Sequence, residues 1–267
     1  MTQRLLAAAV GLAILLPALI WGGQAAVEVI IAIAAVICAL EYAAMAFPTE
    51  ARAASAWMLV CIALVGGSVL YLPWLGLAVP ASLVVIATLT AGTLAPGEDI
   101  SRSADRVSRA LLGIGWISQL VWLALLRRLD DGLAWVFLVL AISWLGDTGG
   151  YFAGRFFGRT PLYPRISPKK TREGAVGGIM LSVVGVFVVR AVGLPTLPPA
   201  HAVALGILLC SAGILGDLAE SMLKRAFQVK DSGKLLPGHG GLLDRIDSVL
   251  FVAPLLFAYA GLAQGRG

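Results

Sequence analysis

The chain has 267 residues, of which 59% are hydrophobic and 13% are charged, and its mean hydropathy is +0.91. Because a soluble domain carries about a quarter charged residues, this composition leaves too little charge to cover a water-facing surface and excludes an ordinary soluble domain. The net charge of +5 favours anionic surroundings, such as phosphate groups or an anionic lipid surface.

Nine membrane-spanning helices are predicted, because apolar blocks near the roughly 20 residues needed to cross a bilayer alternate with prolines, glycines and charges. In chain order they cover residues 5–22, 25–46, 55–72, 74–95, 107–126, 132–156, 173–193, 200–225 and 245–263. The expected fold class is an all-α polytopic membrane protein. Residues 1–126 form an N-terminal transmembrane region of five spans, and residues 127–267 form a C-terminal region of four.

Positive charge divides unevenly between the two ends of these spans. Alternating spans place 16 of the 20 Lys and Arg residues on the side of the N-terminus and four on the other side. Since Lys and Arg concentrate in cytoplasmic loops, we expect a cytoplasmic N-terminus and an outside C-terminus in a bacterial-type inner membrane. The two longest loops, 157–172 and 226–244, then face the cytoplasm.

The cysteines carry no motif. Cys38, Cys61 and Cys210 each fall inside a predicted span, without CxxC or Cys/His spacing. They are therefore expected to be small buried apolar residues, not disulfides or zinc ligands.

Four aspartates on three spans are expected at a similar depth, near the cytoplasmic interface. Asp147 and Asp217 lie in the inner halves of spans that enter from outside, and Asp244 and Asp247 lie in the first turn of the last span. Acids within spans are functional candidates because an uncompensated charge there is costly. Acids that suit a divalent metal, beside basic loops that suit phosphate, indicate a metal-bound polyphosphate as the ligand.

Helical spacing groups several of these residues into stripes. One face of the eighth span carries Asp217, Glu220, Ser221 and Lys224, at i, i+3, i+4 and i+7. In the sixth span, Asp147, Tyr151 and Arg155 form another stripe. Beside it runs a ridge of small residues, which we interpret as a packing surface for a neighbouring helix. The ridge consists of Gly146, Gly150, Gly154 and Gly158.

Each acid also has a structural interpretation. Asp217 would be an unpaired acid within a span, so metal binding is favoured. Asp244 and Asp247 also fit the cap and first turn of a helix, so spacing alone leaves both roles open. Asp147 fits either the site or a pairing with Arg155 or with a neighbouring helix. Glu41, near the cytoplasmic end of the second span, can also reach the site but is not included among the candidates.

The basic and histidine candidates have alternatives too. Lys224 and Arg225 fit either phosphate binding or an interfacial position in which long side chains reach toward water. Lys169, Lys170 and Arg172 fit either phosphate binding or ordinary cytoplasmic charge; Pro164 and Pro168 nearby suggest a fixed loop. A further candidate is the glycine-flanked His239, which either contacts phosphate or braces a turn.

Residues 221–247 read SMLKRAFQVKDSGKLLPGHGGLLDRID. This segment resembles the signature of the phosphatidate cytidylyltransferase (CDP-diacylglycerol synthase) family, which reads S-x-x-K-R, then K-D, then H-G-G-x-x-D-R-x-D. Three further segments fit the same family: WLGDTGGYFAGR (144–155), SPKKTREG (167–174) and GDLAES (216–221). Small departures are Gly150 and Arg172, where the family more often carries alanine and tryptophan. The resemblance covers the C-terminal half, and the N-terminal half is similar only in being helical and membranous.

The resemblance implies a nucleotidyltransferase that joins CTP and phosphatidate to CDP-diacylglycerol and releases pyrophosphate. It implies Mg²⁺, with K⁺ as a candidate second cation. The expected surroundings are a lipid bilayer, with no nucleic-acid partner and a homodimer as the candidate assembly. The candidate catalytic residues are Asp217, Asp244, Lys224 and Asp247, and the candidate metal ligands are Asp217, Asp244 and Asp147. The candidate substrate-binding residues are Ser167, Lys169, Lys170, Thr171, Ser221, Arg225, Lys230, Asp231, His239 and Arg245.

Three other kinds of membrane protein fit the sequence less well. A CTP-using polyprenol kinase would move the γ-phosphoryl group, and the signature over residues 221–247 disfavours it. A transporter would line an ion path with charges at mid-span, whereas here the acids gather near one interface. A purely structural membrane protein would not need acids from three helices at one depth.

Overall fold

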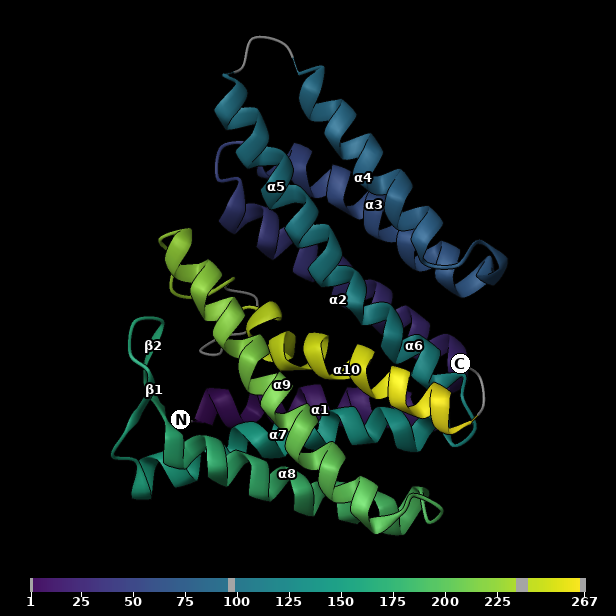
Figure 1. Cartoon of the computed structure of the whole chain (residues 1–267), viewed down its shortest axis with the longest axis vertical. Coiled ribbons are helices and arrows are strands. Elements are labelled where there is room, and N and C mark those ends of the chain that lie inside the picture. Colours follow the sequence, from purple (N-terminus) through teal and green to yellow (C-terminus); the bar gives the residue numbers. More distant parts are fainter. Residues whose placement is uncertain (1, 96–98, 234–239, 265–267) are drawn as a thin grey trace.

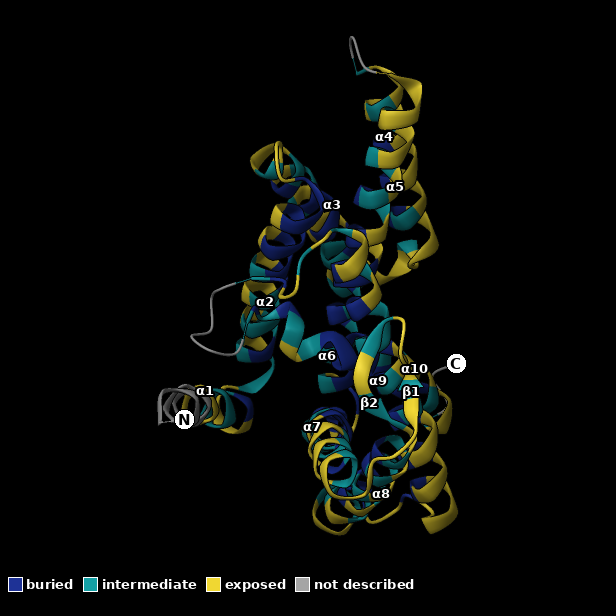
Figure 2. Ribbon diagram, turned by 90° about the vertical axis from the view of Figure 1, so that its left-hand side faces the viewer, coloured by how far each residue is buried: buried dark blue, intermediate teal, exposed yellow. Residues whose placement is uncertain are grey.

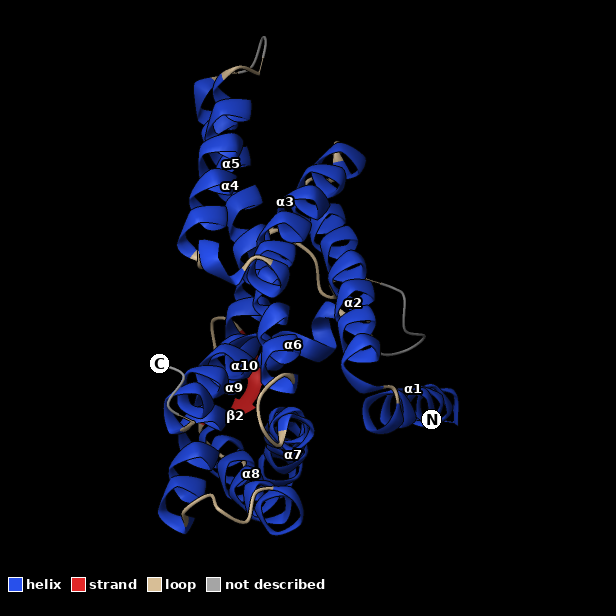
Figure 3. Ribbon diagram, turned by 90° about the vertical axis from the view of Figure 1, so that its right-hand side faces the viewer, coloured by secondary structure: helices blue, strands red, loops and turns tan. Residues whose placement is uncertain are grey.

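The computed structural model describes residues 2–95, 99–233 and 240–264, and this chain is almost entirely helical (Figure 3). In chain order the helices are α1 (Thr2–Trp21), α2 (Gly23–Ala46), α3 (Ala51–Tyr71), α4 (Ala78–Thr93), α5 (Ile100–Ile117), α6 (Val121–Arg127), α7 (Gly132–Phe157), α8 (Arg172–Gly193), α9 (Pro199–Ala226) and α10 (Leu243–Ala263). Between α7 and α8, two short antiparallel strands form a hairpin, β1 (Pro161–Tyr163) and β2 (Ser167–Thr171).

Seven helical segments of the described chain are long and apolar enough to cross a bilayer. They are α2, α3, the continuous α5–α6 segment (Ile100–Arg127), α7, α8, α9 and α10. The predicted spans 5–22 and 74–95 correspond to shorter apolar helices, Gly11–Trp21 within α1 and Ala78–Thr93. The predicted all-α polytopic membrane fold is confirmed, and each of the nine predicted spans coincides with a helix.

Two helix boundaries differ from the prediction for local reasons. α4 begins at Ala78 because Pro73–Leu75 forms a short 3-10 turn and Gly76 follows with a φ of 61°, a conformation that ends a helix. α5 begins at Ile100, ahead of the predicted residue 107, because its first turns are polar and hydropathy does not detect them. The ion pair between Arg109 and Asp105 on this polar part spans one helical turn, at 2.6 Å.

The helices alternate in direction across the molecule (Figure 1). The N-terminus, the β1–β2 hairpin and the end of α9 lie on one side, and the α8–α9 turn and the C-terminus lie on the other. We call the first side the hairpin side; it carries residues 158–171 and 227–233. The described parts of loops 157–172 and 226–244 therefore lie on the same side as the N-terminus, as the predicted spans require.

Two buried apolar clusters share α10. The first joins residues of α7, α9 and α10, including Leu138, Ile142, Leu205 and Leu256. The second joins residues of α2, α3 and α5 to the start of α10, including Tyr42, Met58, Ile117 and Leu250. Buried residues follow the inner faces of these helices, while much of the outer surface is exposed (Figure 2), as expected where lipid covers apolar side chains. The first turn of α10 is thereby held between the N-terminal and C-terminal helices.

Glycines bring α7 and α8 unusually close. A Cβ atom at Gly149 would lie 2.5 Å from the Gly177 carbonyl oxygen, and one at Gly178 would lie 2.7 Å from the Gly146 carbonyl oxygen. Backbone-to-backbone contact of this kind is typical of membrane helices, where van der Waals packing replaces the hydrophobic effect. The predicted glycine ridge on α7 is therefore confirmed as a packing surface, and α8 contributes a matching one.

Candidate active site

A cavity of about 610 Å³ opens near the hairpin side between α7, the hairpin, α8, α9 and α10. It brings together the four aspartates that the sequence placed at one depth. Its acidic lining residues are Asp147, Asp217, Glu220, Asp231, Asp244 and Asp247. Its basic lining residues are Arg155, Lys169, Lys170, Lys224 and Arg245. Acids and bases from α7, β2, α9, α10 and the loop after α9 thus converge on one space.

Three of the acids form a cluster that could hold a cation. Oxygen atoms of Asp217, Glu220 and Asp247 all lie within 4.8 Å of one another. Glu220 and Asp247 are buried, at 1% and 5% exposure, and Glu220 Oε1 has no hydrogen-bond partner among the described residues. Since Mg²⁺ prefers carboxylate oxygens, this donor set fits a magnesium ion. The cluster shares Asp217 with the predicted metal ligands and adds Glu220 and Asp247, while the predicted ligands Asp147 and Asp244 line the same cavity.

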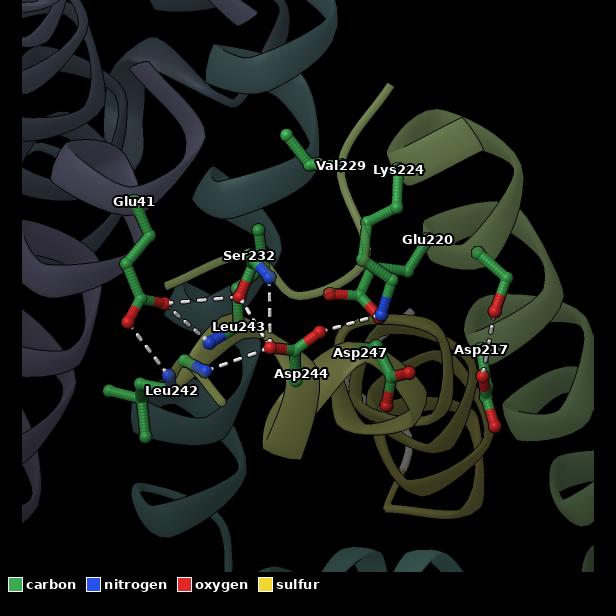
Figure 4. Close-up of polar contacts among 12 residues, drawn as sticks. Glu41, Asp217, Glu220, Lys224, Val229, Ser232, Leu242, Leu243, Asp244 and Asp247 are labelled. Atoms are coloured by element: carbon green, nitrogen blue, oxygen red, sulfur yellow. Dashed lines mark hydrogen bonds and ion pairs between the residues drawn. The ribbon is translucent and has the colours of Figure 1, made fainter. Parts of the chain in front are cut away.

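Asp244 is instead surrounded by protein donors (Figure 4). Its Oδ1 accepts a hydrogen bond from Lys224 Nζ at 2.6 Å. Its Oδ2 accepts bonds from the backbone N–H of Gly241 at 2.8 Å, and from the Ser232 hydroxyl and N–H at 2.9 and 3.0 Å. Lys224 Nζ also donates to Glu220 Oε2 at 2.5 Å. Lys224 therefore links Asp244 to the cluster of three acids.

The hairpin carries its basic residues into the cavity because its ends are tied to α8. Thr171 Oγ1 caps α8 by accepting the N–H of Gly174 at 3.1 Å. The Glu173 carboxylate accepts the backbone N–H groups of Arg159 and Thr160 at the other end of the hairpin. This fixed loop was anticipated from its prolines. It allows Lys170 to form an ion pair with Asp217 Oδ2, across from β2 to α9.

Several sequence candidates lie elsewhere. Ser221 donates to Asp217 Oδ1 at 3.4 Å without lining the cavity. Arg225 donates to the Val229 carbonyl oxygen at the end of α9, at 3.3 Å. Ser167 and the exposed Lys230 do not line the cavity. His239 lies outside the described residues.

Five other candidates from the sequence lie at the cavity. Asp147, Lys169, Thr171, Asp231 and Arg245 all line the cavity. Among the ion pairs of the described residues, none joins Asp147 to Arg155, the partner that one interpretation of Asp147 required.

Sequence reasoning missed two acids. Glu220 was placed on the same helical stripe as Asp217 and Lys224 but was not counted as a candidate, although its i+3 spacing from Asp217 is the signal that could have found it. Glu41 reaches the start of α10 from α2. Its carboxylate accepts the N–H groups of Leu242 and Leu243, both at 2.9 Å (Figure 4). Its position inside a span was the only signal available.

Comparison with known proteins shows which family the chain resembles. The sequence model of the cytidylyltransferase family matches residues 2–263. A phosphatidate cytidylyltransferase of Bacillus subtilis is 45% identical over 133 residues, 49% of this chain and 49% of that protein. One from Staphylococcus saprophyticus is 44% identical over 155 residues, 56% and 55% of the two chains. One from Thermotoga maritima is 43% identical over 142 residues, 51% and 52%. Each alignment spans about half the length of the curated relative.

Proposed function

Since this chain belongs to the cytidylyltransferase family, we propose that it is a membrane phosphatidate cytidylyltransferase, which makes CDP-diacylglycerol and pyrophosphate from CTP and phosphatidate. The observation that carries the proposal is a cavity of about 610 Å³ in which five basic and six acidic side chains converge near the hairpin side. Both substrates are phosphate esters, and one of them is a lipid. A charged cavity at the end of a membrane helix bundle suits both.

The reaction requires positioning and charge neutralisation. An ionised phosphate oxygen of phosphatidate attacks the α-phosphorus of CTP, the bond from that phosphorus to the bridging oxygen breaks, and pyrophosphate leaves with the electron pair. Since the attacking oxygen is already ionised at neutral pH, no general base is needed. Lys169, Lys170 and Arg245 are proposed to hold the phosphate groups in line, which is where most of the catalytic effect of phosphoryl transfer enzymes arises.

Asp217, Glu220 and Asp247 are proposed to hold Mg²⁺, because their oxygens lie close together and one oxygen of Glu220 is buried without a partner among the described residues. When bound, Mg²⁺ would neutralise negative charge on the phosphates. K⁺ is proposed as a second cation on the family resemblance alone. Lys170, which is paired with Asp217 in the structure, would exchange this carboxylate for a substrate phosphate.

The proposed location is the cytoplasmic (inner) membrane, with the hairpin side facing the cytoplasm. CTP would then reach the cavity from the cytoplasm. Phosphatidate would enter from the adjacent leaflet, since its acyl chains stay in the bilayer. The support for this orientation is the concentration of Lys and Arg in the loops of the hairpin side.

The test uses purified protein with CTP labelled on either the α- or the γ-phosphate. We expect α-label in a lipid product and γ-label in pyrophosphate, with both transfers stopped by chelation of Mg²⁺. Diacylglycerol should not replace phosphatidate, because it lacks the ionised phosphate. Transfer of γ-label into lipid, with α-label left in soluble CDP, would overturn the proposal and identify a lipid kinase instead.

A further inference from the structure

The N-terminal half supplies one buried acid to the start of α10. Glu41 lies in α2 and is 8% exposed. Its Oε1 accepts the N–H of Leu242 and its Oε2 accepts the N–H of Leu243, both at 2.9 Å. These donors belong to the first residues of α10, where a helix has no internal acceptors. Leu242, at the cap position, has no side chain that could accept them. Glu41 therefore caps α10 from a helix about 200 residues earlier in the chain.

The carboxylate is tightly enclosed by backbone. A Cβ atom at Gly233 would lie 2.5 Å from Glu41 Oε1, and one at Gly241 would lie 2.6 Å from Oε2. Gly233 and Gly241 belong to the two described parts of the 226–244 loop, residues 226–233 and 240–244, so both parts pack against Glu41. Within the described residues Glu41 forms no ion pair, and the N-terminus of α10, which attracts anions, stabilises its charge.

Glu41 and Asp244 hold the same pieces of backbone. The Ser232 hydroxyl lies 2.9 Å from Asp244 Oδ2 and 3.5 Å from Glu41 Oε2. Asp244 also accepts the N–H of Gly241, which precedes the two N–H groups bound by Glu41. Figure 4 shows the two carboxylates on either side of Ser232 and the first turn of α10. A shift of this turn would therefore move Asp244.

From Asp244 the contacts continue to the acids of the candidate metal site. Asp244 accepts from Lys224 at 2.6 Å, and Lys224 donates to Glu220 at 2.5 Å. Glu220 is one of the three acids whose oxygens lie within 4.8 Å of one another. Hydrogen bonds and the backbone of residues 241–243 thus connect Glu41 on α2, outside the cavity, to the centre of the site.

We propose that Glu41 is a positioning residue of this enzyme: it fixes the first turn of α10 and the Ser232 hydroxyl, and so holds Asp244 and Lys224 in the geometry that the site needs. The proposal rests on the proposed function for the reaction it serves. It does not require Glu41 to touch either substrate. It also gives the N-terminal helices a role in the site beyond membrane anchoring.

The test compares Glu41→Gln with the matched variant Glu28→Gln, in full-length protein in lipid nanodiscs. Glu28 lies on the same helix and is also hydrogen-bonded and ion-paired. Its partners Tyr71 and Arg128 belong to the ends of α3 and α6, which lie opposite the hairpin side (Figure 1). Gln at position 41 would direct an amide N–H₂ at a backbone donor. We expect kcat per folded enzyme to fall by about 10- to 100-fold, as for loss of an outer-shell partner of a metal site. KM for CTP should change little, and Glu28→Gln should keep kcat near the wild-type value.

Amide hydrogen exchange gives a readout independent of catalysis. The Leu242 and Leu243 amides should exchange faster in Glu41→Gln and at the wild-type rate in Glu28→Gln. Glu41→Asp, which keeps the charge, should recover part of the kcat. Ser232→Ala is a smaller change that should also lower kcat. It replaces Glu41→Gln as the test variant if Glu41→Gln does not fold.

The outcomes separate the two proposals. Absence of α-label transfer in the wild type would remove the proposed cytidylyltransferase function, whatever the exchange data show. With an active wild type, unchanged amide exchange in Glu41→Gln would overturn the positioning role. So would faster exchange with an undiminished kcat, or an equal loss of kcat in Glu28→Gln.

Discussion

At the scale of single residues, the acid cluster makes the sharpest prediction. Asp217→Asn and Asp247→Asn keep the shape of each side chain but remove its charge from the proposed metal site. We expect kcat to fall by on the order of 10³-fold in each, as for the loss of a major electrostatic contact to the transition state. Steady-state assays with CTP and phosphatidate would measure this.

The control for these variants is Asp105→Asn. Asp105 is exposed on α5 and pairs with Arg109, away from the cavity. It should keep near wild-type activity, and all three variants should insert and express normally. Loss of a transition-state contact should lower kcat far more than about tenfold. If Asp217→Asn or Asp247→Asn retained more than about a tenth of wild-type kcat, that residue would not belong to the metal site.

Helical spacing allowed part of this site to be predicted from sequence. Asp217 and Lys224 share one face of α9, and the structure directs both into the cavity. Spacing cannot give the rotation of a helix against its neighbours, and that rotation decides which flanking residue points inward. Arg225, next to Lys224 in sequence, therefore turns to the end of α9, whereas Glu220 lies on the Asp217 face, as its i+3 spacing allows. Asp244 was predicted as a metal ligand, but the backbone donors that surround it come from a loop whose path is not encoded in any periodic pattern.

At the scale of elements, the α7–α8 pair depends on glycine. In Gly149→Ala, the added methyl group would press on the Gly177 carbonyl oxygen and on the Leu181 side chain, at 2.5 and 2.8 Å. Because a backbone atom cannot rotate away, we expect a loss of about 1–3 kcal/mol in the free energy of unfolding. Activity should fall as well, since α7 carries Asp147 and α8 anchors the hairpin with Lys170. Thermal unfolding in detergent measures the stability change.

The matched control is Gly66→Ala in α3. A Cβ atom at Gly66 meets nothing within 4 Å, so the substitution adds no clash. Because alanine favours a helix over glycine by up to about 1 kcal/mol, we expect unchanged or slightly higher stability. Equal melting temperatures for Gly149→Ala and the wild type would mean that α7 and α8 can separate without cost.

Long apolar helices were predictable and the hairpin was not, for a physical reason. The spans follow from the length and hydropathy of each segment, both of which are local properties. The strand Ser167–Thr171 has a proline and two lysines and no alternation of apolar residues, so it has no strand signal of its own. The hairpin forms because Thr171 at its end and Glu173, which binds Arg159 at its beginning, fasten it to α8.

At the scale of the whole molecule, α10 joins the N-terminal helices to the C-terminal helices. The motifs quoted from the sequence all lie in the C-terminal half and the N-terminal helices carry none of them, although the cytidylyltransferase family model matches residues 2–263. In the structure, the start of α10 packs into the cluster formed by α2, α3 and α5 and is capped by Glu41. Contacts between residues about 200 positions apart leave no periodic signal in one sequence, so this dependence could not be predicted from it.

Charge distribution and the alternating path of the helices together predict the orientation in the membrane. Sixteen of the 20 Lys and Arg residues lie on the hairpin side by the predicted spans, and such loops remain in the cytoplasm. Arg165→Cys in the exposed hairpin should therefore resist a membrane-impermeant maleimide in intact cells and react after lysis. Thr196→Cys, exposed in the α8–α9 turn on the opposite side, should react in intact cells. The native Cys38, Cys61 and Cys210 are buried, as predicted, and should give no background. Labelling of Arg165→Cys in intact cells, with protection of Thr196→Cys, would invert the orientation and place the cavity away from cytoplasmic CTP.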